Sequence, residues 1–137
     1  MKYFYWFMAL LVFFPATLTF AAPEQTKRFT ATVGEDGVQR VDLRGGSYYF
    51  DPNYLVVKVN VPVALIITKE PGMAPHNIVM KAKDAGLEFN EFLESKPKTI
   101  TFTPTKTGRY PFYCTKRLLF FKDHRAQGME GTIEVVE

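Results

Sequence analysis

The sequence predicts an all-β protein, a Greek-key sandwich or barrel of seven to eight strands. Short segments alternate apolar with polar residues, as half-buried strands do, and clusters of Gly, Pro, Asp and Asn separate them. The 13 Phe and 7 Tyr among 137 residues favour strands over a helical bundle. This length fits one domain. The single cysteine excludes an internal disulfide and therefore a disulfide-stapled scaffold.

Residues 1–21 have the features of a signal peptide. Lys2 precedes an apolar run over residues 3–14, and Thr19 and Ala21 are the small residues before the expected cleavage point. Pro15 also favours cleavage, so we expect export, most simply to a bacterial periplasm. The alternative is an uncleaved membrane anchor, because residues 3–22 approach the length of a membrane span. We expect contact with a membrane only in that second case.

The rest of the chain divides into strand candidates that turn residues separate. Residues 61–69 are the most apolar candidate, so we expect both faces of this strand to be buried. Residues 85–94 are expected to hold a short helical turn. The remaining candidates are residues 28–33, 38–43, 47–50, 54–59, 77–81, 98–103, 109–114 and 131–136. We expect residues 22–46 to form an N-terminal segment with the first strands, and residues 47–137 to form the functional domain.

The charge balance excludes one class of partner. A formal net charge of +3 is only mildly basic, and the proposed signal peptide contributes just one charged residue, Lys2. A nucleic-acid-binding surface needs a dense cationic stripe, which this sequence lacks. We therefore expect no nucleic-acid partner.

The few metal-binding residues are the most informative feature. The chain has two histidines and one cysteine. His76 follows the turn after the most apolar strand candidate, Cys114 ends the penultimate candidate, and His124 and Met129 precede the last. Singly, each fits an ordinary core or surface position. Together, one thiolate, two imidazoles and a thioether are the ligand set of a mononuclear copper site, since they bind both Cu(I) and Cu(II).

The segments around these residues carry a family resemblance. They are FDP at residues 50–52 with the following LVVKVNVPVALIITKE, PHN at 75–77, ITFTPTKTGRYPFYC at 100–114 and GMEG at 128–131. Over residues 47–137 the sequence resembles the cupredoxins, the blue-copper family. The resemblance implies one copper ion with His76, Cys114 and His124 as equatorial ligands and Met129 as the axial ligand. It also implies that Asn77, after the first histidine, ties the ligand loops together.

The loop between Cys114 and His124 departs from the family pattern. Nine residues intervene where cupredoxins usually have only a few. Lengthening a loop costs little closure entropy, so His124 can still reach the site. Four consecutive apolar residues, Leu118–Phe121, lie in this loop between Lys116, Arg117 and Lys122. They either fold back over the copper or form an exposed docking patch. Because the loop is long, we expect His124 to be the more exposed histidine.

The expected function is that of a periplasmic one-electron carrier, which cycles its copper between Cu(I) and Cu(II). We expect no enzymatic activity, because Met129 would fill the axial position and no second metal-ligand cluster is evident. The alternative is a Cu(I) chaperone or copper-holding protein that serves the assembly of a copper enzyme. We expect a monomer whose acidic redox partner docks near Lys116–Lys122.

Overall fold

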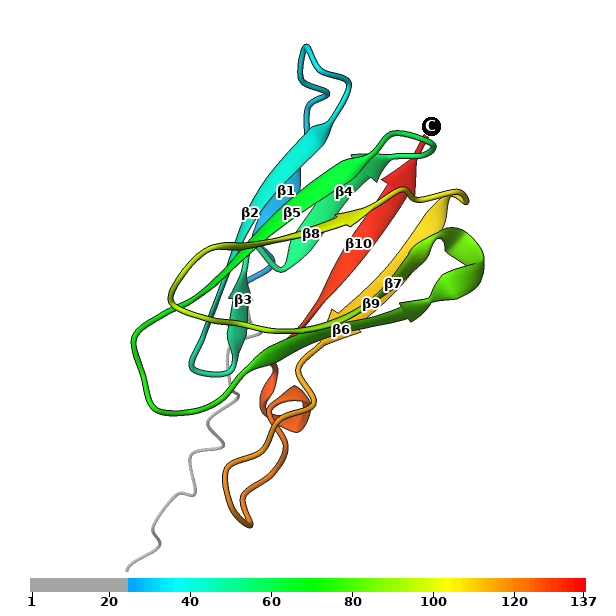
Figure 1. Cartoon of the computed structure of the whole chain (residues 1–137). Helices are drawn as coiled ribbons and strands as arrows, with labels where there is room; N and C mark the ends of the chain where they lie inside the picture. The colour runs from blue at the N-terminus through cyan, green and yellow to red at the C-terminus, as the bar shows by residue number, and fades with distance from the viewer. Residues whose placement is uncertain (1–24) are drawn as a thin grey trace, which may run out of the picture.

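The computed structural model describes residues 25–137 and arranges them in two layers of β-sheet (Figure 1). The predicted signal peptide, residues 1–21, lies outside the described residues. Within residues 25–137, no helix is both long enough and apolar enough to cross a membrane.

The all-β prediction is confirmed, with ten strands among the described residues in place of seven or eight. β1 (Arg28–Thr30) and β3 (Tyr49–Asp51) fall on the candidates at residues 28–33 and 47–50, whereas no strand candidate covered β7 (Leu87–Phe92). Sheet order is β1-β4-β10-β9-β6-β7 in the six-stranded sheet and β3-β2-β5-β8 in the other. The strands are β1 Arg28–Thr30, β2 Gln39–Gly46, β3 Tyr49–Asp51, β4 Tyr54–Lys58, β5 Val63–Lys69, β6 Asn77–Ala82, β7 Leu87–Phe92, β8 Lys98–Phe102, β9 Gly108–Tyr113 and β10 Glu130–Val136.

The N-terminal strands belong to both sheets. β1 pairs in parallel with β4, while β2 pairs in parallel with β5 and antiparallel with β3. Residues 28–46 therefore share the core with the rest of the described chain. The division of the chain at residues 21 and 46 stays a prediction.

The core lies between the two sheets and follows the alternation of the sequence. On β2, Val41 and Leu43 are buried, whereas Arg40 and Asp42 point outward. Phe112 on β9 and Ile133 on β10 are completely buried from the other side. Burial of side chains this large contributes roughly 1.5–3 kcal/mol each to the stability of the fold.

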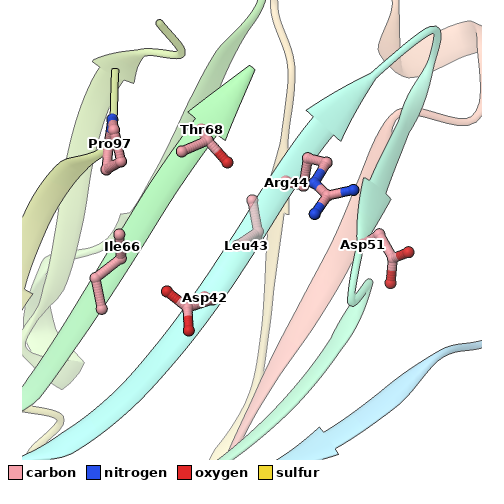
Figure 2. Close-up of a pocket in the computed structure, with 7 residues that line it drawn as sticks. All are labelled: Asp42, Leu43, Arg44, Asp51, Ile66, Thr68 and Pro97. Atoms are coloured by element: carbon pink, nitrogen blue, oxygen red, sulfur yellow. The ribbon is translucent and has the colours of Figure 1, made fainter. Parts of the chain in front are cut away.

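Strand β5 differs from the prediction, because only one of its faces is buried. Leu65 and Ile67 face the core with no exposed surface, while Ile66 and Thr68 on the other face are half-buried. Figure 2 shows these two side chains beside β2, where they line a hollow of about 310 Å³. The hollow contains no histidine, cysteine or methionine, so it is not part of the candidate metal site.

The expected helical turn at residues 85–94 is also wrong. A 3-10 turn occupies Lys83–Ala85, and the strand β7 follows it. Buried Leu87 and Phe89 alternate with exposed Glu88 and Asn90, which is the period of a strand. Pairing with β6 along all six residues then fixes the extended form.

The sheet order brings three chain positions to one end of the sandwich. β6, β9 and β10 are neighbours, and β9 is antiparallel to both of the others. The start of β6, the end of β9 and the start of β10 therefore lie at the same end of the sandwich. The residues that precede or follow these strands there are His76, Cys114 and Met129.

Candidate metal centre

Three donor atoms converge at this end of the sandwich. The Nδ1 atoms of His76 and His124 lie 3.1 Å apart, and the Cys114 Sγ lies 3.5 Å from the Nδ1 of His124. All three donors lie within 4.8 Å of one another. Nitrogen and sulfur ligands lie about 2.0 and 2.3 Å from a bound ion, so separations of this size fit ligands that share one ion. The three side chains are buried.

The long loop delivers His124 because its ends are held together. The backbone N–H of His124 donates to the carbonyl of Lys116 at 2.8 Å. This hydrogen bond closes residues 117–123 into a loop of their own. A 3-10 turn, η2 (Arg125–Gln127), follows His124, and the carboxylate of Asp123 accepts a hydrogen bond from the Ala126 N–H. The additional residues therefore project from the sandwich, as the orange loop of Figure 1 shows, and do not displace the histidine.

The profile of the cupredoxin-like domain family matches residues 6–133, almost the whole chain. The chain belongs to the cupredoxin-like family. This membership confirms the resemblance noted in the sequence. Among curated proteins, none matches the sequence significantly.

Solved structures share this cupredoxin-like fold at low sequence identity. The metal-binding domain of the Cu(I)-exporting P-type ATPase CopA of Streptococcus pneumoniae, determined with Cu(I), has a TM-score of 0.60 and 20% identity over 82% of this chain and 99% of that one. The periplasmic domain of cytochrome oxidase subunit II of Bradyrhizobium japonicum has a TM-score of 0.55 and 20% identity over 72% of this chain and 83% of that one. Auracyanin A, a "blue" copper protein of Chloroflexus aurantiacus, has a TM-score of 0.54 and 16% identity over 73% of this chain and 100% of that one. At these identities the likeness shows the fold alone.

The donor set of this cupredoxin-like domain fits a single copper ion. Two imidazole nitrogens and a thiolate face one another in a buried cluster, and this combination of soft and borderline ligands suits copper in both oxidation states. Hard-cation sites need several oxygen ligands instead, and the cluster contains none.

Met129 lies against the cluster. It has no exposed surface, its N–H donates to the His124 carbonyl at 2.9 Å, and its carbonyl accepts from the Cys114 N–H at 3.0 Å. A Cβ added at Gly45 would lie 3.3 Å from the Met129 Cε, so the glycine leaves room for this side chain. Its predicted role as the axial ligand stays a prediction.

Asn77 joins the two ligand loops, as the family resemblance implied. Its carboxamide oxygen accepts a hydrogen bond from the Thr115 N–H at 2.9 Å, and its amide group donates to the Thr115 hydroxyl at 3.0 Å. The amide group also donates to Asn90 at 2.9 Å. The residue after His76 thereby fixes the residue after Cys114. Sequence analysis did not identify Thr115, because an exposed threonine after a strand carries no signal of its own.

Burial sets the protonation of the donors. It is the main reason why the pKa of His76 falls from 6.5 to about 4, with His124 and Lys69 as smaller causes. Burial likewise lowers the pKa of His124 and raises that of the Cys114 thiol. Both imidazoles are therefore neutral at pH 7 with a lone pair free for a metal. Binding of a metal as thiolate would release the proton of Cys114.

The prediction that His124 is the more exposed histidine is wrong. His124 has no exposed surface, whereas His76 is 5% exposed. The rings of Tyr48 and His124 pack edge-to-face, with centroids 5.0 Å apart. Sequence analysis missed Tyr48, since a tyrosine in a turn far from the ligand segments gave no sign of this contact.

The apolar residues of the long loop do not cover the cluster. Leu118 is 41% exposed, and Leu119, Phe120 and Phe121 are more exposed still. Of the two alternatives for these residues, the exposed patch agrees with the structure. Lys116 borders the patch, with its ammonium group 4.1 Å from the centroid of the Phe92 ring.

Proposed function

We propose that this protein binds one copper ion through His76, Cys114, His124 and Met129 and acts as an exported one-electron carrier. The observation that carries the proposal is the buried convergence of two imidazole Nδ1 atoms and one thiol sulfur. Copper, when bound, supplies reversible exchange of a single electron between Cu(I) and Cu(II).

The surrounding residues suit this role because they hold the ligands in place. Asn77 and Thr115 bond the two ligand loops to each other, and the backbone of Met129 bonds to both Cys114 and His124. Ligands that are fixed before the electron arrives need to move little when the charge changes. Burial of the cluster keeps water from becoming an additional ligand. We infer that the protein transfers electrons and does not transform a substrate.

Spectroscopy of the copper-loaded, oxidised protein tests this function. We expect an intense visible band from thiolate-to-copper charge transfer, an EPR spectrum of a single copper site, and reversible one-electron reduction. A colourless protein with no reversible reduction would contradict the role of carrier.

A second candidate is a protein that holds or delivers Cu(I). The observation in its favour is the shared fold with the metal-binding domain of the Cu(I)-exporting ATPase CopA, together with thiol and thioether side chains that prefer Cu(I). A stable, colourless Cu(I) form that passes its ion to an acceptor protein, with no stable Cu(II) form, would favour this candidate.

We further propose that the redox partner docks on the long loop. The exposed apolar residues Leu118–Phe121 would supply the contact, and Arg117 and Lys122 beside them are exposed cations that would attract an acidic partner. The loop joins two proposed ligands, so docking there would bring the partner close to the copper.

A further inference from the structure

The turn between β2 and β3 holds a tyrosine in an unfavourable backbone conformation. Gly46 pairs with Tyr49, which leaves Ser47 and Tyr48 as the two turn residues. Tyr48 has φ of 66°, in the left-handed region where glycine and asparagine are the usual residues. A bulky residue persists in this region only where its surroundings hold it there.

The contact that accompanies this conformation is the one with His124. The Tyr48 ring meets the His124 ring at an interplanar angle of 69°, the edge-to-face arrangement that aromatic pairs favour. His76 contacts the same imidazole, with centroids 4.8 Å apart. His124 is therefore in contact with two rings and has no exposed surface. Its Nε2 is buried and has no hydrogen-bond partner among the described residues.

The glycines before Tyr48 show how closely this hairpin packs on the site. A Cβ added at Gly45 would lie 2.1 Å from the Leu93 Cδ2 as well as close to Met129. A Cβ at Gly46 would lie 2.5 Å from the Tyr49 ring. Gly45 thus lets the end of β2 approach Met129, and Gly46 leaves room for the Tyr49 ring within the hairpin. The turn that follows places Tyr48 against His124.

We propose that Tyr48 is a positioning residue, which fixes the His124 ring and shields its Nε2 from water. With the ring held edge-on, Nδ1 stays directed at His76 and Cys114. With Nε2 covered, water and small solutes do not reach the imidazole. The consequence for copper rests on the proposed function, whereas the shielding itself is a property of the metal-free protein.

Chemical modification of the metal-free, full-length protein tests the shielding. Diethyl pyrocarbonate acylates accessible neutral imidazoles, and peptide mass spectrometry reads each histidine separately. We expect slow modification of His124 in the wild type and at least a tenfold faster rate in Tyr48→Gly, which removes the ring and suits the positive φ. Tyr48→Phe keeps the ring and should keep the slow rate. Tyr49→Ala, the matched control in the same hairpin, should leave His124 slow.

Two results would overturn the proposal. One is an equal rate at His124 in the wild type and in Tyr48→Gly. The other is a gain that is the same at His76 and His124, in both Tyr48→Gly and the alternative variant Tyr48→Asn, since the turn would then support the whole fold and not cover His124. Circular dichroism distinguishes a folded variant from an unfolded one.

A second measurement separates this inference from the proposed function. Transfer of Cu(I) from the loaded protein to bathocuproine disulfonate should be several-fold faster in Tyr48→Gly than in Tyr48→Phe. If the wild type binds no copper, the proposed function fails while the modification rates still decide the role of Tyr48. If copper is bound and transfer is equally fast in both variants, the positioning role is wrong even though the site is correct.

Discussion

The Nδ1 atoms of His76 and His124 face each other at 3.1 Å, although the two residues are 48 positions apart in the chain. Two imidazolium groups cannot lie at this distance without strong repulsion, because each would direct an N–H at the other. The distance is compatible with two neutral rings, or with one neutral ring and one imidazolium that donates a hydrogen bond to it. The metal-free protein must therefore keep at least one of the two histidines unprotonated in order to keep this arrangement.

The first prediction concerns acid stability without metal. Unfolded histidines take up protons near pH 6.5, whereas folded His76 resists protonation until about pH 4 and the pKa of His124 is lowered as well. The unfolded state then binds more protons, so the free energy of unfolding should decrease as the pH falls from about 6.5 to about 4. Urea denaturation at a series of pH values measures this slope. The double variant His76→Gln, His124→Gln should show a flatter profile, and equal slopes would contradict the prediction.

The second prediction concerns the thiolate. Cys114→Ser should abolish the visible band of the copper-loaded protein, because a serine hydroxyl does not supply the charge transfer of a thiolate. The fold should persist, with a loss of about 1–2 kcal/mol in unfolding free energy for the buried hydroxyl. Absorption spectra and urea denaturation measure the two effects. An intense band in the serine variant would mean that Cys114 is not a ligand.

The sequence was sufficient for the fold class because alternation reports burial directly. Val41 and Leu43 on β2 and Ile133 and Val135 on β10 lie on the core face that the alternation implies. The prediction failed for residues 61–69, since a run of apolar residues does not reveal whether one face or two are covered. It failed again at β7, where the alternation of residues 87–90 was present in the sequence but was interpreted as a helical turn.

The site was predictable for a different reason, the scarcity of its residues. With one cysteine and two histidines in the chain, family order alone brought His76, Cys114 and His124 together. The sequence did not predict that His124 is buried, since loop length suggested exposure. The ring of Tyr48, which packs against His124, comes from far away in the chain. Contacts of this kind depend on how strands from different sheets meet, which local patterns do not encode.

The third prediction concerns the bond between the ligand loops. Asn77→Ala removes a buried side chain that accepts from the Thr115 N–H and should lower the unfolding free energy by roughly 1–3 kcal/mol. It should also shift the visible band, because the residue that follows Cys114 is no longer held. Asn90→Ala is the matched control, as it removes only one bond to Asn77. Equal effects of the two variants on the band would argue against the role of Asn77 in holding the loop.

The fourth prediction concerns the axial position. Met129→Gln should lower the reduction potential, because an amide oxygen is a harder ligand than a thioether and stabilises Cu(II). The side chains are similar in size, so the fold should tolerate the change. Met73→Gln serves as the control, since Met73 is fully exposed and should leave the potential unchanged. Voltammetry measures both. A potential that moves with Met73 and not with Met129 would reverse the assignment.

The fifth prediction concerns electrostatic attraction at the long loop. Arg117→Glu with Lys122→Glu reverses the two exposed cations beside Leu118–Phe121, so the copper-loaded, reduced protein should react more slowly with anionic hexacyanoferrate(III), by roughly tenfold at low salt. Its reaction with cationic tris(phenanthroline)cobalt(III) should become faster, because attraction replaces repulsion. Lys83→Glu with Lys106→Glu makes the same change in net charge at the opposite end of the sandwich and should alter both rates much less. In rising salt, the stopped-flow rates of the wild type and the two double variants should converge, because screening removes the electrostatic contribution. If the two double variants behave alike at low salt, only net charge matters. Electrons then do not leave the protein near the loop, and the proposed docking of an acidic partner there is wrong.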